Sequence, residues 1–199
     1  MQAHTTRRIF LTGTLAAFGM AATPVWALTE QGAKTLVDKV VAEVQNVIGS
    51  GKSDSAVLRD LEGIFVKYAD VNIMAQYALG VDGRSASNAQ KRAFTDAFQG
   101  YIARKYGKQF KEFIGGRVDV EKVSAIRSGY EVQTKAYLQG QSPFEVTFHV
   151  SDKSGRDKFF NVYIEGVNLL LTERTEIGSM LDRRGGDINA VVSDLKKLG

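Results

Sequence analysis

The hydrophobic period of this chain changes near Arg117, and this change limits the fold more than any other feature of the sequence. Upstream of it, apolar and mostly aromatic residues recur at spacings of four and three: Phe94, Phe98, Ile102, Tyr106, Phe110 and Phe113. This spacing is typical of one face of a long surface helix. Downstream of it, apolar and polar residues alternate over 130–138 and 144–151, which is typical of half-buried antiparallel strands. The chain therefore passes from helices into a sheet at this point.

More helices are predicted ahead of the sheet. Thr29 is the predicted N-cap of a first helix, and helical spacing of apolar residues returns over 57–68 and 71–79. Ser87 and Gln90 have the spacing of a capping box, which places the start of the long helix just after Ser87.

The last third of the chain predicts one more strand and two helices. Alternation continues over 160–164, and Gly166 allows a bend before the apolar run 167–171, so that a bent final strand would curve the sheet. Segments 172–181 and 187–198 then predict two short helices. The order of elements indicates an α+β fold, with helices packed on the concave face of one antiparallel sheet of about four strands.

The first 27 residues have the features of an export signal rather than of the fold. The pair Arg7 and Arg8 precedes the moderately apolar run 11–22, and small residues follow at the positions expected before a cleavage site. The order of arginines, phenylalanine and leucine resembles a twin-arginine signal. A membrane anchor is disfavoured because the run is shorter than the roughly 20 residues that span a bilayer. We therefore expect residues 1–27 to be cleaved and 28–199 to form a single exported domain.

Composition and motifs argue against several classes of function. The chain has no cysteine, which excludes disulfides and thiolate chemistry, and its net charge of +4 is small for a nucleic-acid-binding protein. Beyond the signal, His149 is the one remaining histidine, and no acidic cluster has the spacing of a metal site, so no metal or cofactor is expected. His149 is conceivable as a general base, but no nucleophile motif accompanies it.

Two stretches resemble the MlaC family of periplasmic phospholipid-binding proteins, which belongs to the system that maintains lipid asymmetry. The first covers Val71 to Phe113 and includes Val-Asn-Ile-Met-Ala, Leu-Gly and Arg-Ser-Ala-Ser in that order. The second covers Phe159 to Leu198 and includes Val-Tyr-Ile-Glu-Gly-Val-Asn from Val162, with Arg174 downstream. The chain departs from the family pattern at four positions: Gly83, Asn161, Asn168 and Glu173.

The resemblance implies an NTF2-like cone in which the acyl chains of a phospholipid enter an apolar cavity between helices and sheet. It also implies a carrier that moves lipid between an outer-membrane lipoprotein complex and an inner-membrane ABC transporter complex, without cofactor or catalysis. The candidate lining residues are Phe65, Met74, Tyr77, Phe98, Tyr101, Tyr106, Phe110, Val132, Phe148, Phe160, Val162 and Leu169. The candidate contacts for a headgroup or a protein partner are Arg84, Arg104, Lys108 and Arg174.

Two other classes of function are compatible with the sequence. An NTF2-like enzyme would place a titratable group deep in the same cone. A periplasmic adaptor would have a solid core, no ligand and an exposed apolar patch.

Overall fold

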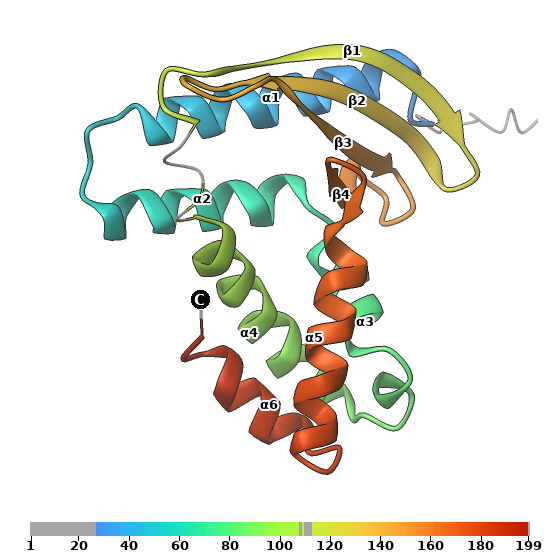
Figure 1. Cartoon of the computed structure of the whole chain (residues 1–199). Coiled ribbons are helices and arrows are strands. Elements are labelled where there is room, and N and C mark those ends of the chain that lie inside the picture. The colour runs from blue at the N-terminus through green and yellow to red at the C-terminus, as the bar shows by residue number, and fades with distance from the viewer. Residues whose placement is uncertain (1–26, 108, 110–112, 199) are drawn as a thin grey trace, which may run out of the picture.

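The computed structural model describes residues 27–107, 109 and 113–198, and the predicted signal lies outside this part of the chain apart from Ala27. Helix α1 (Glu30–Ile48) begins at Thr29, whose hydroxyl accepts a hydrogen bond from the Gly32 amide as predicted. Helix α2 (Asp54–Tyr68) returns antiparallel beside α1 (Figure 1). Helix α3 (Val71–Leu79) and the short 3-10 turn η1 (Asp82–Arg84) follow. The predicted helices over this segment are therefore present.

Helix α4 (Asn88–Gly107) begins at the predicted capping box but ends earlier than the aromatic spacing indicated. The Gln90 amide donates to the Ser87 hydroxyl at 3.2 Å, and the Ser87 amide donates to the Gln90 side chain at 3.0 Å. The expectation that the helix runs to Phe113 is wrong. A Cβ atom at Gly107 would lie 2.5 Å from the Leu58 side chain, so α2 and α4 approach closely where α4 ends.

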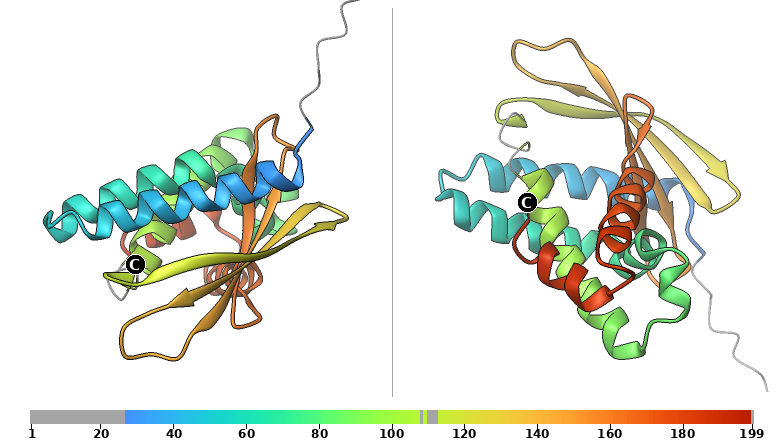
Figure 2. Two further views of the ribbon diagram at one scale, coloured as in Figure 1. Left: turned by 90° about the horizontal axis from the view of Figure 1, so that it is seen from above. Right: turned by 60° about the horizontal axis from the view of Figure 1, so that its bottom comes forward.

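A five-stranded antiparallel meander follows, in the order β1-β2-β3-β4-β5. Its strands are β1 (Arg117–Ile126), β2 (Gly129–Tyr137), β3 (Phe144–Ser151), β4 (Lys158–Ile164) and the two-residue β5 (Val167–Asn168). The sheet curves over α1, and α1 contacts β1, β2 and β3 (Figures 1 and 2). The α+β class is confirmed, with one very short strand more than the sequence indicated.

Two local expectations about the end of the sheet are wrong. Strand β4 carries a bulge opposite β3: His149 pairs with Asn161 and Val150 pairs with Phe159, so Phe160 has no partner. The apolar run after Gly166 is not a strand beyond Asn168. Instead, the Asn168 side chain accepts a hydrogen bond from the Leu171 amide and caps helix α5 (Leu169–Arg183). A capping side chain thus converts most of this run into a helix.

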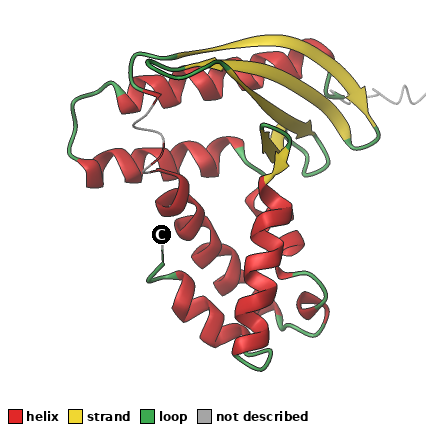
Figure 3. Ribbon diagram, viewed as in Figure 1, coloured by secondary structure: helices red, strands yellow, loops and turns green. Residues whose placement is uncertain are grey.

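The chain ends in α6 (Ile188–Leu195), which begins at Asp187, whose carboxylate accepts hydrogen bonds from the amides of Asn189 and Ala190. Helices α3 to α6 form a helical half below the pair α1 and α2 and the sheet (Figures 1 and 3). No helix in the described part of the chain is long and apolar enough to cross a membrane.

Candidate functional site

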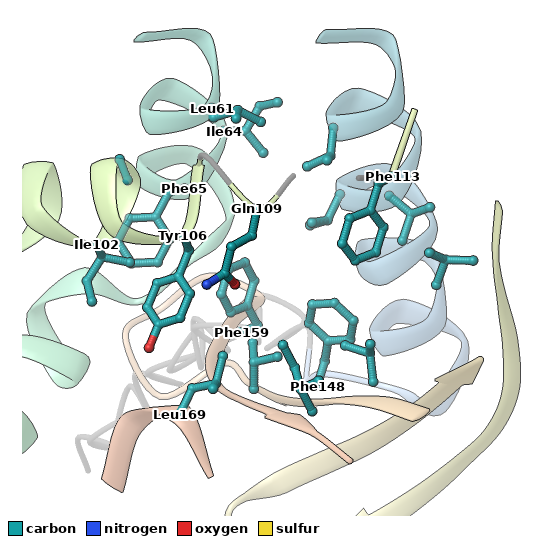
Figure 4. Close-up of a pocket in the computed structure, with 18 of the residues that line it drawn as sticks. Leu61, Ile64, Phe65, Ile102, Tyr106, Gln109, Phe113, Phe148, Phe159 and Leu169 are labelled. Atoms are coloured by element: carbon teal, nitrogen blue, oxygen red, sulfur yellow. The ribbon is translucent and has the colours of Figure 1, made fainter. Parts of the chain in front are cut away.

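A cavity of about 200 Å³ lies between α1, α2, the end of α4, the start of α5 and the inner face of the sheet. Aromatic rings from α2, the end of α4, the inner face of the sheet and the segment before β1 surround it (Figure 4): Phe65, Tyr106, Phe148, Phe159 and Phe113. Most of the other lining residues are aliphatic, including Val40, Val41, Val44, Leu61, Ile64, Ile102, Val146, Val162, Ile164, Leu169 and Leu170. A wall of this kind is suited to the apolar part of a ligand.

Polar side chains in the lining come from Gln45, Gln109 and Glu173. Gln109 is exposed, so the cavity reaches the surface beside it. The Gln45 side chain donates to the Gly116 carbonyl at 3.2 Å. Glu173 is buried on the α5 side of the cavity, which places a carboxylate beside an otherwise apolar interior.

Half of the twelve candidate lining residues border this cavity: Phe65, Met74, Tyr106, Phe148, Val162 and Leu169. Phe148 and Val162 are cross-strand partners whose side chains share the inner face of the sheet. The Phe148 ring meets the Phe159 ring edge to face, with 5.9 Å between centroids. That these residues contact a lipid remains a prediction.

Three other candidates belong to solid packing rather than to the cavity wall. Phe98 has no exposed surface and stacks on Phe94 with 5.9 Å between ring centroids. The Tyr101 hydroxyl donates to Glu176 at 2.8 Å, and Val132 is fully buried under the sheet. The helical spacing of α4 correctly predicted Phe98 as buried, but among the described residues of α4 only its last turns reach the cavity.

The remaining candidates lie elsewhere. Tyr77 is 40% exposed on α3, where the Arg174 guanidinium lies 5.0 Å above its ring. Phe160 packs against His149 on the outer face of the sheet, because the bulge in β4 reverses the alternation that placed it inside. Phe159 takes the inward position instead. In the sequence, the two adjacent phenylalanines indicate that one of them points inward, but not which one. Phe110 lies outside the described residues.

None of the described candidate cations borders the cavity, and two of them hold helices together. The Arg104 guanidinium donates to the carbonyls of Leu195 and Leu198 at 2.6 and 2.9 Å, at the end of α6. Arg174 donates to the Tyr77 carbonyl at 3.0 Å. Arg84 is exposed on η1, and Lys108 lies outside the described residues. The three described candidates for headgroup contacts therefore do not converge.

Behind the cavity wall, a polar network joins α4 to α5. The Lys105 ammonium donates to Glu173 Oε1 and to Glu176 Oε2, each at 2.7 Å. The Tyr106 hydroxyl donates to the same Glu173 Oε1 at 2.5 Å. Glu173 Oε2 is buried and has no hydrogen-bond partner in the described part of the chain. In the sequence, Glu173 stands out only as a departure from the family pattern, because the alternation that marks inward positions on strands does not extend to α5.

The network shifts the pKa values of its members. Burial next to these carboxylates raises the pKa values of Tyr101 and Tyr106, so both phenols stay protonated. Burial opposes the charge of Lys105, but its hydrogen bonds to Glu173 and Glu176 prevail and raise its pKa. Burial likewise acts to raise the pKa of Glu176, but hydrogen bonds from Lys105 and Tyr101 prevail and lower it.

His149 lies on the outer face of the sheet, away from the cavity. Its Nε2 atom is 3.3 Å from Glu131 Oε2, and its ring packs between Phe160 and Tyr163. His149 therefore cannot act as a general base on a ligand in the cavity. Among the described residues, no group of three or more histidine and acidic side chains is placed to hold a metal ion.

A curved antiparallel sheet whose concave side meets helices around an apolar cavity defines a cone of the NTF2-like class. The chain belongs to the MlaC protein family, whose model matches residues 34–197. Among solved structures it is similar to that of a phospholipid-binding protein from Ralstonia solanacearum in complex with a phospholipid. The TM-score is 0.69 at 20% identity, over 84% of this chain and 94% of the other.

Proposed function

We propose that this protein binds a phospholipid by enclosing its acyl chains in the apolar cavity. The observation that carries this proposal is the almost wholly aliphatic and aromatic wall, in a member of the MlaC family. Two acyl chains expose on the order of 30 methylenes, and each contributes about 0.8 kcal/mol when it leaves water. A carrier must therefore offer an interior about as apolar as a membrane, and this cavity is of that kind.

The proposal extends to transport. We expect the protein to be exported by the signal in residues 1–27 and to act in the periplasm. There it would take lipid from one complex and deliver it to another, between an inner-membrane ABC transporter complex of the Mla type and an outer-membrane lipoprotein complex. Family membership and the phospholipid in the Ralstonia protein support a binding or transport role over catalysis.

The two alternatives fit the geometry less well. A solid-core adaptor would have no cavity, whereas aromatic rings here surround an open space (Figure 4). An enzyme would need a base aimed at its substrate. The cavity does have a carboxylate at its edge, but the hydrogen bonds of Lys105 and Tyr106 both end on one oxygen of Glu173 and hold it against α4.

The first experiment tests lipid binding directly. The full chain is expressed in a bacterium, the exported protein is purified without detergent, and an organic extract is analysed by mass spectrometry. We expect phospholipid at about one molecule per protein. The variant Val162→Trp, which fills the cavity, should lose it, and Phe160→Trp on the opposite face of the sheet should retain it. An empty wild-type extract, with no uptake from vesicles, would overturn the proposal.

The same preparation tests export. The purified protein should begin at Leu28, and the double variant Arg7→Lys, Arg8→Lys should leave the precursor in the cytoplasm if the twin-arginine route is used. Continued export of that variant would indicate an ordinary secretory route.

A further inference from the structure

The buried carboxylate of Glu173 is chemically out of place beside this cavity. Its side chain is 2% exposed, and the residue borders a space whose other walls are mainly aliphatic and aromatic. Both donors that reach it, the Lys105 ammonium and the Tyr106 hydroxyl, end on Oε1, while Oε2 is buried without a partner in the described part of the chain. A buried acceptor of this kind is costly unless something donates to it.

The charges around Glu173 do not remove this cost. Lys105 is shared with Glu176, so one ammonium serves two carboxylates. The Tyr106 hydroxyl donates its hydrogen bond to Glu173 and keeps its proton, which leaves the phenol oxygen able to accept a further hydrogen bond. Tyr106 and Glu173 both border the cavity, so this edge of it carries acceptors. The complementary group on a ligand is a hydrogen-bond donor.

We infer that Glu173 and Tyr106 form a hydroxyl-recognition site, and that the cavity prefers lipids whose acyl chain carries a hydroxyl group over the same lipids without it. This inference rests on the proposed phospholipid-binding function and specifies which lipids the cavity selects. A hydroxyl on the chain supplies one neutral donor and can enter an apolar space at small cost once it is hydrogen-bonded.

Two other donors fit less well. An ammonium group on the ligand would meet Lys105, whose Nζ atom lies 2.7 Å from Glu173 Oε1, and would be repelled by it. A hydroxyl on a headgroup would bring its phosphate next to the Glu173 carboxylate, and like charges in a poorly solvated site repel strongly. A hydroxyl at a distance from the phosphate avoids both conflicts, which points to the acyl chain.

The test is a competition for loading. Delipidated full-length mature protein is mixed with vesicles that contain equal amounts of stearoyl and hydroxystearoyl phosphatidylcholine, with the hydroxyl placed at different carbons in separate runs, and bound lipid is quantified by mass spectrometry. We expect at least one positional isomer to be enriched roughly tenfold, the ratio that one net hydrogen bond provides. Glu173→Leu should abolish the enrichment of the hydroxylated lipid.

Two variants separate recognition from architecture. Tyr106→Phe keeps the ring and should reduce the enrichment, since it removes one acceptor. Glu176→Gln is the matched control, because Glu176 belongs to the same network but does not border the cavity, and its selectivity should equal that of the wild type. An equal loss in Glu176→Gln would overturn the inference, since the effect would then come from the network as a whole.

The remaining outcomes are also decisive. If the wild type loads lipid without preferring any hydroxylated isomer, the inference is wrong and the proposed function stands. If neither lipid loads, the proposed function fails and the inference fails with it. A crystal structure of the loaded complex should place the ligand hydroxyl within hydrogen-bond distance of Glu173 or Tyr106. A water molecule on Oε2 in the presence of the hydroxylated lipid would contradict this.

Discussion

The helical half (α3 to α6) and the half formed by α1, α2 and the sheet both bury aromatic side chains, but with different results. The first packs them into a filled core, and the second leaves a cavity between them. In the helical half, Phe98 stacks on Phe94 with no exposed surface, and helices meet closely enough to fill the space between them. In the other half, Phe148 is only partly buried and borders the open cavity. There a curved sheet, and not another layer of helices, lies opposite the helices. The side chains that line the space between them do not fill it. Aromatic content alone therefore does not distinguish a core from a binding site; the separation of the facing elements does.

The largest loss of stability should come from removing an aromatic ring from the filled core of the helical half. Phe98→Ala is expected to lower the free energy of unfolding by about 3–5 kcal/mol, because the ring leaves a void among close-packed neighbours. Phe148→Ala should cost roughly half as much or less, because that ring already borders open space and loses fewer contacts. Urea denaturation followed by circular dichroism measures both. Equal costs would show that the two halves do not differ in packing.

The second largest loss of stability should come from disrupting the polar network between α4 and α5. Lys105→Met removes the only described ion-pair partner of the buried Glu173 carboxylate, and is expected to lower the free energy of unfolding by about 2–3 kcal/mol. Adding Glu173→Leu to that variant should restore most of the loss, because the uncompensated charge is then gone. If the double variant is as unstable as the single one, Lys105 stabilises the protein through packing of its stem instead.

Two adjacent phenylalanines of β4 lie on opposite faces of the sheet, so their substitution compares the stability that each face contributes. Phe159→Ala should cost about 2 kcal/mol, since the ring is buried and contacts the rings of Phe65 and Phe148. Phe160→Ala should cost less than about 1 kcal/mol, since that ring lies on the outer face against His149. Thermal unfolding of the two variants gives the comparison directly. The reverse order would mean that β4 has no bulge at Phe160.

The sequence predicted local features well and distances between elements poorly. The caps at Thr29 and Ser87 and the alternation in β2 and β3 depend on neighbouring residues, and each is present. The bulge at Phe160, in contrast, depends on the register with β3, and the close approach of α2 to Gly107 at the end of α4 depends on how the two helices pack. The cavity depends on how far helices and sheet stand apart. For the same reason, the resemblance to a family predicted a cavity, whereas periodicity alone identified only buried faces.

The smallest effect is the pH dependence of the α4–α5 network. Because the pKa of Glu176 is lowered in the folded protein, the unfolded chain takes up its proton first as the pH falls below 4.5. This contribution to stability is therefore present above that pH and is lost as the pH falls through the folded pKa. Glu176→Gln lacks it, so its free energy of unfolding should fall less than that of the wild type between pH 6 and pH 3, a difference of less than about 1 kcal/mol for a partly exposed group.

Urea denaturation at several pH values between these limits measures this difference. Asp194→Asn provides the comparison, because Arg184 lowers the pKa of that carboxyl in an exposed pair remote from the cavity. Each variant should lose less free energy of unfolding between pH 6 and pH 3 than the wild type. The two differences should add in a double variant, because Glu176 and Asp194 share no partner. If Glu176→Gln keeps the full acid loss of the wild type, the Lys105 network does not stabilise the ionised carboxylate. The network behind the cavity wall would then add no electrostatic stability, and only packing would distinguish that region from the exposed surface.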